Sequence, residues 1–234
     1  MARSLIPIVM APALLLAAPA QSSSLQIGPT RLQMVGAERT TTLTIRNPDS
    51  APTNIQVRVF DWKQVGGADH YAPSTALLAS PPQATLAPGQ AQVIRVVAEA
   101  LPAGGGERAF RLVIDQIPND QGPSGAGVRT AIRVLAPVFI TPSTKDRPKL
   151  RWEARRTAGG VLLTAINDGI AHDRLVAAKV TAGGKPASEP IEGYILGKAR
   201  RSWTLPDVPA AAPSLRLSGQ GDFGQVEADV PIAR

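Results

Sequence analysis

The two histidines of the chain, His70 and His172, are the side chains best suited to acid–base catalysis or metal binding at neutral pH. Neither stands in a metal-ligand spacing, such as two histidines four residues apart on a helix. His172 and Asp173 could form half of a hydrolytic triad, but no serine lies in a Gly-x-Ser-x-Gly turn that would expose a nucleophile. We therefore interpret both histidines as solvent-exposed loop residues, and predict that the protein is not an enzyme and has no metal or cofactor.

The carboxylates do not suggest a catalytic pair either. Glu107, Asp115 and Asp222 fall in separate predicted strands or loops, which favours structural ion pairs. The glycine run 104–106 lacks the lysine of a phosphate-binding loop and is interpreted as a connector. These observations indicate a binding protein, whose candidate surface is a sheet edge or an interdomain cleft.

The first twenty residues have the pattern of a secretory signal peptide. A single charge at Arg3 precedes an apolar stretch from Leu5 to Ala18, and the small residues Ala18 and Ala20 suit signal peptidase. A membrane anchor is the alternative, but the stretch contains prolines and is shorter than the ~20 residues that a bilayer span needs. We therefore predict cleavage near Ala20 and export of the chain.

The composition argues against several other classes of protein. The chain has no cysteine, which excludes disulfides and thiolate metal sites and, in an exported protein, favours a bacterial source. Its formal net charge is +7, but the basic residues are dispersed outside 145–156. A nucleic-acid site would need a focused patch with stacking aromatic residues. The alternating charges within 145–151 favour a solvated sheet face instead, so we expect no nucleic-acid partner.

Strand patterns recur about every ten residues, between turns rich in glycine, proline and asparagine, and no segment after the signal has a sustained helical period. The predicted fold class is therefore all-β. Leu25 and Ile27 share one parity, Gly28-Pro29 interrupts it, and Leu32 and Met34 resume in the other, as expected where an edge strand passes between two sheets.

The length allows two domains of the ~100-residue size that is typical of immunoglobulin-like sandwiches. Residues 142–148 begin and end with a proline and indicate a linker. We therefore predict a signal peptide at 1–20, an N-terminal domain at 21–141 and a C-terminal β-sandwich domain at 149–234.

Several motifs of the first half occur in an order that is specific to one family. They are Ile27-Gly28-Pro29-Thr30-Arg31, Trp62, Ser80-Pro81-Pro82, the block from Leu86 to Val96, the block from Phe110 to Pro118, and Pro137-Val138-Phe139. With these motifs the chain resembles the PapD-like periplasmic pilus-assembly chaperones. Pro137-Val138-Phe139 leans toward the branch that serves spore-coat-like or archaic pili. The second half of the chain matches the family's motifs only weakly, at residues 167–169 and 221–224.

The resemblance implies two immunoglobulin-like sandwiches set at an angle, in the periplasm. Members of the family bind pilus subunits that lack their last strand by inserting a strand of their own, and deliver them to an outer-membrane usher. A self-capping homodimer is a possible form of the free protein. The alternative from another class is a non-catalytic surface or adhesive β-sandwich protein.

The strand that matches the family's donor strand runs from about Val128 to Val134. Val128, Thr130, Ile132 and Val134 share one parity and are the expected groove-filling residues. The alternative is that the same alternation packs this strand into its own domain, since a sandwich strand needs such alternation anyway.

The family anchors the carboxylate at the subunit's C-terminus with two basic residues, which match Arg31 and Arg133 here. The alternative for both is an exposed charge that protects a sheet edge. Family members also have interdomain ion pairs, to which Glu107 and Asp222 correspond. The arginine expected beside them is missing, because Ala136-Pro137 occupies that position.

Overall fold

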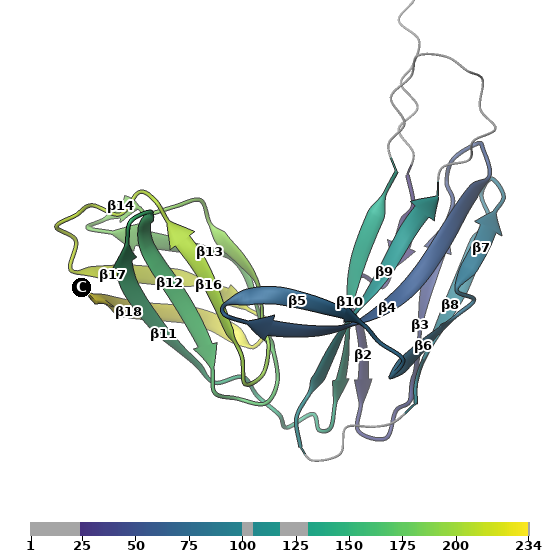
Figure 1. Cartoon of the computed structure of the whole chain (residues 1–234), viewed down its shortest axis with the longest axis horizontal. Helices are drawn as coiled ribbons and strands as arrows, with labels where there is room; N and C mark the ends of the chain where they lie inside the picture. The colour runs from purple at the N-terminus through teal and green to yellow at the C-terminus, as the bar shows by residue number, and fades with distance from the viewer. Residues whose placement is uncertain (1–23, 100–104, 118–130, 234) are drawn as a thin grey trace, which may run out of the picture.

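The structure is a computed structural model that describes residues 24–99, 105–117 and 131–233. In these ranges the chain forms strands β1 to β18 and contains no helix, which confirms the all-β prediction. Figure 1 shows two β-sandwiches that meet at an angle. No helix of the described residues is long and apolar enough to cross a membrane. The predicted signal peptide lies outside the described residues.

Two sheets pack face to face in the first sandwich. The four-stranded sheet has the order β1 (Gln26–Gly28), β3 (Thr40–Arg46), β8 (Ala91–Ala98) and β6 (Leu77–Ser80). The six-stranded sheet has the order β2 (Leu32–Val35), β10 (Arg133–Thr141), β9 (Arg108–Ile117), β4 (Thr53–Val65) and β5 (Ala68–Pro73), and β7 (Gln83–Leu86) also pairs with β4. All pairs between these strands are antiparallel except β10 with β2, which is parallel.

Strand alternation explains how this sandwich is filled. Phe110, Leu112 and Ile114 share one parity of β9, as predicted, and all three are fully buried in the core between the two sheets. The predicted passage of an edge strand between sheets at Gly28-Pro29 is confirmed, because β1 pairs in the four-stranded sheet and β2 in the six-stranded one.

The second sandwich is built from one bent path of strands. Its order is β14 (Lys185–Pro186), β13 (Asp173–Ala182), β17 (Ser214–Gly221), β18 (Gly224–Ala233), β11 (Leu150–Thr157), β12 (Gly160–Asn167) and β16 (Arg200–Leu205), with β15 (Ile191–Ile195) beside β13. Leu163 of β12, Val180 of β13 and Leu217 of β17 meet in one buried cluster, so the two arms of the path face each other across a core.

Residues 142–149 carry no strand and connect β10 to β11. Gly169, in the turn after β12, lies against this connection. A Cβ atom at Gly169 would lie 2.4 Å from the carbonyl oxygen of Arg147 and 2.6 Å from the backbone nitrogen of Lys149. A glycine is therefore required for this close approach. The domain bounds 21–141 and 149–234, with their linker 142–148, remain a prediction.

Candidate functional site

A cluster of apolar and aromatic side chains joins the two sandwiches. Trp62 of β4 and Phe139 of β10 pack against Leu196, which follows β15 in the second sandwich. The ring of Tyr194 lies edge-on to Trp62, with 5.4 Å between centroids, and His172 stacks on Phe139 with 3.6 Å between centroids. We call these five residues the junction. Trp62 and Phe139 lie outside the core of their own sandwich, so their nearly complete burial depends on the second sandwich.

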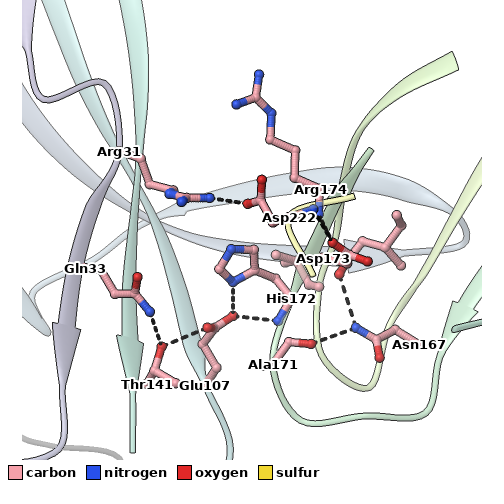
Figure 2. Close-up of polar contacts among 12 residues, drawn as sticks. Arg31, Gln33, Glu107, Thr141, Asn167, Ala171, His172, Asp173, Arg174 and Asp222 are labelled. Carbon is pink, nitrogen blue, oxygen red and sulfur yellow. Dashed lines mark hydrogen bonds and ion pairs between the residues drawn. The ribbon is translucent and has the colours of Figure 1, made fainter. Parts of the chain in front are cut away.

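A buried carboxylate holds the junction together (Figure 2). One oxygen of Glu107 accepts hydrogen bonds from the backbone N–H of His172 (3.0 Å) and from its Nδ1 (2.7 Å). The other oxygen accepts a hydrogen bond from the hydroxyl of Thr141 (2.9 Å). The side chains of Glu107 and His172 are only 2% and 5% exposed, so this contact between the sandwiches is closed to water.

The prediction that His172 is a solvent-exposed loop residue was wrong. Its position between β12 and β13 is a loop, as predicted, but Phe139 and Glu107 of the other sandwich cover the ring. This burial depends on how the two sandwiches meet, which no local pattern shows. His70 is exposed, as predicted, but it lies in β5 rather than in a loop.

The hairpin of β4 and β5 reaches across to the second sandwich (Figure 1). Gln64 donates a hydrogen bond to the carbonyl of Tyr194 (2.8 Å) and accepts one from the backbone N–H of Leu196 (3.0 Å). At the hairpin tip the backbone N–H of Ser202 donates to the carbonyl of Gly67 (3.0 Å). Gly67 has φ +88°, and a Cβ atom there would lie 2.4 Å from the hydroxyl oxygen of Ser202. Only a glycine fits at this docked tip.

The charged carboxylate of Asp69 holds the same hairpin in place. Its carboxylate accepts hydrogen bonds from Nε1 of Trp62 (3.0 Å) and from the amide of Gln64 (2.9 Å), and it pairs with Arg201 of β16 (2.6 Å). Burial alone would raise the pKa of Asp69, but the hydrogen bonds from Gln64, Trp62 and Arg201 outweigh it and hold the pKa below its ordinary value. The charged form of Asp69 therefore stabilises the folded state.

We expect Asp69→Asn to lower the free energy of unfolding at pH 7 by about 1–3 kcal/mol, because it removes charged hydrogen bonds. Since the pKa of Asp69 is lower in the folded state, its stabilisation is present above the unfolded-state pKa and is lost as the pH falls through the folded-state value. Urea unfolding of both proteins at a series of pH values measures this difference. A difference that is the same at pH 7 and at pH 2.5 would contradict the role of the Asp69 charge.

A second polar link between the sandwiches pairs Arg31, which precedes β2, with Asp222, which lies between β17 and β18 (Figure 2). The backbone N–H of Asp222 donates a hydrogen bond to the carboxylate of Asp173 (3.0 Å). Burial raises the pKa of Asp173, although its hydrogen bonds from backbone N–H groups act in the opposite direction. The side chains of Arg31 and Asp222 are 41% and 21% exposed, so this link is open to solvent.

A row of residues across three strands places a second arginine near Arg31. Pro137 of β10 pairs with Arg111 of β9, and Arg31 lies beside Pro137 because the next residues, Leu32 and Val138, are paired. Two strand spacings separate Arg31 from Arg111, which is about 10 Å between Cα atoms. The guanidinium of Arg111 lies 3.6 Å from the ring centre of Trp62. Its Nε is buried and bonds to no atom of the described residues.

Arg133, the other predicted anchor, lies at the opposite end of this face. It is four residues from Pro137 along β10, a rise of about 13 Å. Its Nε donates to Asp115 of β9 (2.5 Å), which also pairs with Arg58 of β4 (2.5 Å). Burial alone would raise the pKa of Asp115, but the hydrogen bonds and charges of the two arginines outweigh it and lower the pKa. Arg133 is thus engaged by a carboxylate, while its side chain stays 62% exposed.

The predicted donor segment leads into β10. Val128 and Thr130 lie outside the described residues, and Ile132 and Val134 are half-buried. Val134 packs against the core of its own sandwich, in line with the alternative weighed for this alternation. In the described part of the chain, β10 pairs with β2 only from Val138 to Thr141, so residues 133–137 pair on one side alone. This stretch is an open sheet edge.

Sequence reasoning placed Glu107, Asp222, Arg31 and Arg133 on the site, and all four lie on the facing surfaces of the sandwiches or on the sheet face beside them. It missed Arg111. The only available signal was its parity, opposite to that of the buried residues 110, 112 and 114. Among the described residues, no group of three or more histidine, cysteine, aspartate or glutamate side chains could hold a metal ion.

Comparison of the sequence with protein-family models gives a match. The family model described as "Pili and flagellar-assembly chaperone, PapD N-terminal domain" matches residues 24–145. No curated protein matches the sequence significantly.

Several solved chaperone structures share this fold. A chain of the CsuC-CsuE chaperone–tip adhesion subunit pre-assembly complex, from the archaic Csu pili of Acinetobacter baumannii, is 22% identical, with a TM-score of 0.70, over 91% of this chain and 100% of that chain. The E. coli chaperone DraB is 22% identical, with a TM-score of 0.63, over 91% and 98%. The Salmonella enterica complex of SafA pilin with the SafB chaperone is 22% identical, with a TM-score of 0.63, over 90% and 95%.

Proposed function

Because the chain belongs to the family of pili and flagellar-assembly chaperones, whose model matches just over half of its residues, we propose that it is a periplasmic chaperone for pilus subunits. It binds subunits that lack a strand, stabilises them by donor-strand complementation, and delivers them to an outer-membrane usher. The signal peptide at 1–20 directs its export, and it acts without catalysis or a cofactor. When free, it can cap its own open edge by forming a homodimer.

The open edge of β10 carries this proposal. Residues 133–137 pair with a neighbouring strand, β9, on one side only, so the other side can accept an added strand, although the carbonyl of Leu135 already accepts a hydrogen bond from the side chain of Arg111 (3.3 Å). A subunit without its last strand exposes an apolar groove and an unpaired edge, which invites aggregation until a strand fills it. The two unpaired edges are complementary. The side chains of Val128, Thr130 and Ile132 fill the groove, while Val134 packs against its own sandwich.

Arg31 is the first anchor for the carboxylate at the end of the subunit, since it lies beside this edge at Pro137. Arg133 is the second anchor implied by the resemblance, but it is about 13 Å along the strand and bonds to Asp115. Arg111 lies nearer, on the other side of Pro137, and has no ion pair among the described residues. We favour Arg31 with Arg111 as the anchor, and Arg133 as the alternative second cation.

Co-expression with a pilus subunit encoded beside this protein tests the proposal. We expect the subunit to co-purify with the chaperone, and Arg31→Ala and Arg111→Ala each to reduce recovery at least about 30-fold, since loss of one partner of a buried charged hydrogen bond costs 2–5 kcal/mol. Arg133→Ala then has a smaller effect. The matched control is Arg216→Ala, which removes an exposed arginine that pairs with Asp229.

Thermal unfolding of each variant must show that it is folded before recovery is compared. Failure of the unsubstituted protein to retain any subunit would contradict the chaperone function. Retention that survives Arg111→Ala but is lost in both Arg31→Ala and Arg133→Ala would replace Arg111 with the alternative second cation, Arg133.

A further inference from the structure

The two polar links between the sandwiches differ in how easily they can be broken. The side chains of Glu107 and His172 are almost fully buried, and separating them would leave buried polar groups without a partner, which is strongly unfavourable. Arg31 and Asp222 are partly exposed, and exposed ion pairs of this kind contribute little to stability. The first link is therefore durable, while the second can open and close without separating the sandwiches.

Asp222 is held in position independently of Arg31. It lies at the tip of the β17–β18 hairpin, where its backbone N–H donates to the carboxylate of Asp173 (3.0 Å) and to the carbonyl of Arg174 (3.2 Å). Asp173 is itself buried and bonds to the backbone N–H of Arg174 (2.8 Å). The side-chain carboxylate of Asp222 thus remains presented toward the first sandwich even when Arg31 turns away.

Arg31 therefore already binds a carboxylate that comes from outside its own sandwich. A guanidinium recognises carboxylates by their charge and planar shape, and does not distinguish a side chain from a chain terminus. An incoming carboxylate must displace Asp222 or share Arg31 with it, and it meets the negative charge of Asp222 in either case. The two carboxylates compete for one cation.

We propose that Asp222 is a built-in competitor for the ligand carboxylate, and that it sets how strongly Arg31 binds a subunit terminus. This inference rests on the proposed function for the identity of the ligand, a subunit's terminal carboxylate. Its first consequence is that removing the charge of Asp222 tightens carboxylate binding. Its second is that binding at Arg31 opens one link between the sandwiches and leaves the Glu107–His172 link intact, so the ligand and the second sandwich are thermodynamically coupled.

The test uses acetate as the probe, so that it does not depend on a subunit. Sodium acetate replaces sodium chloride at constant ionic strength, and the Nε–H resonance of Arg31, assigned by its absence in Arg31→Lys, is followed by NMR. We expect the midpoint to be about two- to fivefold lower in Asp222→Asn than in the unsubstituted protein, the range that an exposed ion pair supplies. Asparagine keeps the backbone N–H and the shape, and removes only the charge.

Asp229→Asn is the matched control, because it breaks another exposed arginine–aspartate pair between β17 and β18, and it should leave the midpoint unchanged. An equal or higher midpoint in Asp222→Asn would overturn the inference and show that Asp222 only orients Arg31. A lower midpoint without any capture of a co-expressed subunit would instead contradict the proposed function and leave the competition at Arg31 standing. The two failures are therefore distinguishable.

Discussion

Replacing Glu107 by alanine is expected to lower the free energy of unfolding by about 3–5 kcal/mol, because it removes one partner of a buried polar pair. The backbone N–H and the ring of His172 and the hydroxyl of Thr141 would lose their acceptor. Phe139 covers the imidazole at 3.6 Å between ring centres, so water cannot replace the carboxylate without opening the junction. Urea unfolding followed by tryptophan fluorescence measures the loss, since Trp62 lies in the junction.

The matched control is Glu227→Ala, which removes an exposed glutamate of β18 and should change the free energy by no more than about 0.5 kcal/mol. Glu107→Gln should fall between the two, because the amide oxygen can still accept a hydrogen bond while the negative charge is gone. A loss below 1 kcal/mol in Glu107→Ala would show that the sandwiches do not depend on this pair for their contact.

Much of the fold follows from patterns that are local in the chain. Buried positions in β9 alternate as a strand between a core and an outer face must, and this parity identified Phe110, Leu112 and Ile114. The change of parity at Gly28-Pro29 predicted the passage from β1 to β2 for the same reason. Such features depend only on residues that are close together in the chain, so they can be predicted from the sequence alone.

The partners across the junction could not be predicted in this way. Glu107 and Asp222 were identified from the family resemblance, but their partners, His172 and Arg31, depend on the angle between the sandwiches. The arginine expected near Ala136-Pro137 is missing, and His172 and Arg31 supply the polar groups instead. Local patterns also cannot show that Phe139 would cover the ring of His172.

Trp62 is the residue whose loss we expect to affect both stability and binding. Its side chain is 3% exposed and packs against Phe139 and Leu196, so Trp62→Ala should lower the free energy of unfolding by about 3–5 kcal/mol. The same ring faces the guanidinium of Arg111 at 3.6 Å and fixes its position through a cation–π contact. Its Nε1 donates to Asp69, which pairs with Arg201 of the other sandwich.

Trp62→Phe separates these roles, because phenylalanine keeps an aromatic face for Arg111 and most of the packing but loses the hydrogen bond to Asp69. We expect it to lose about 1–3 kcal/mol of stability, close to the loss in Asp69→Asn, and to retain subunit capture. Trp62→Ala should lose subunit capture at a temperature where it is still folded, as measured by co-purification together with circular dichroism.

Full capture by folded Trp62→Ala would mean that Arg111 does not need the indole ring, and would weaken the assignment of Arg111 to the anchor. If Trp62→Phe loses capture as well, the hydrogen bond from Trp62 to Asp69 is needed for binding. Asp69 and the hairpin of β4 and β5 would then control binding through the angle between the sandwiches.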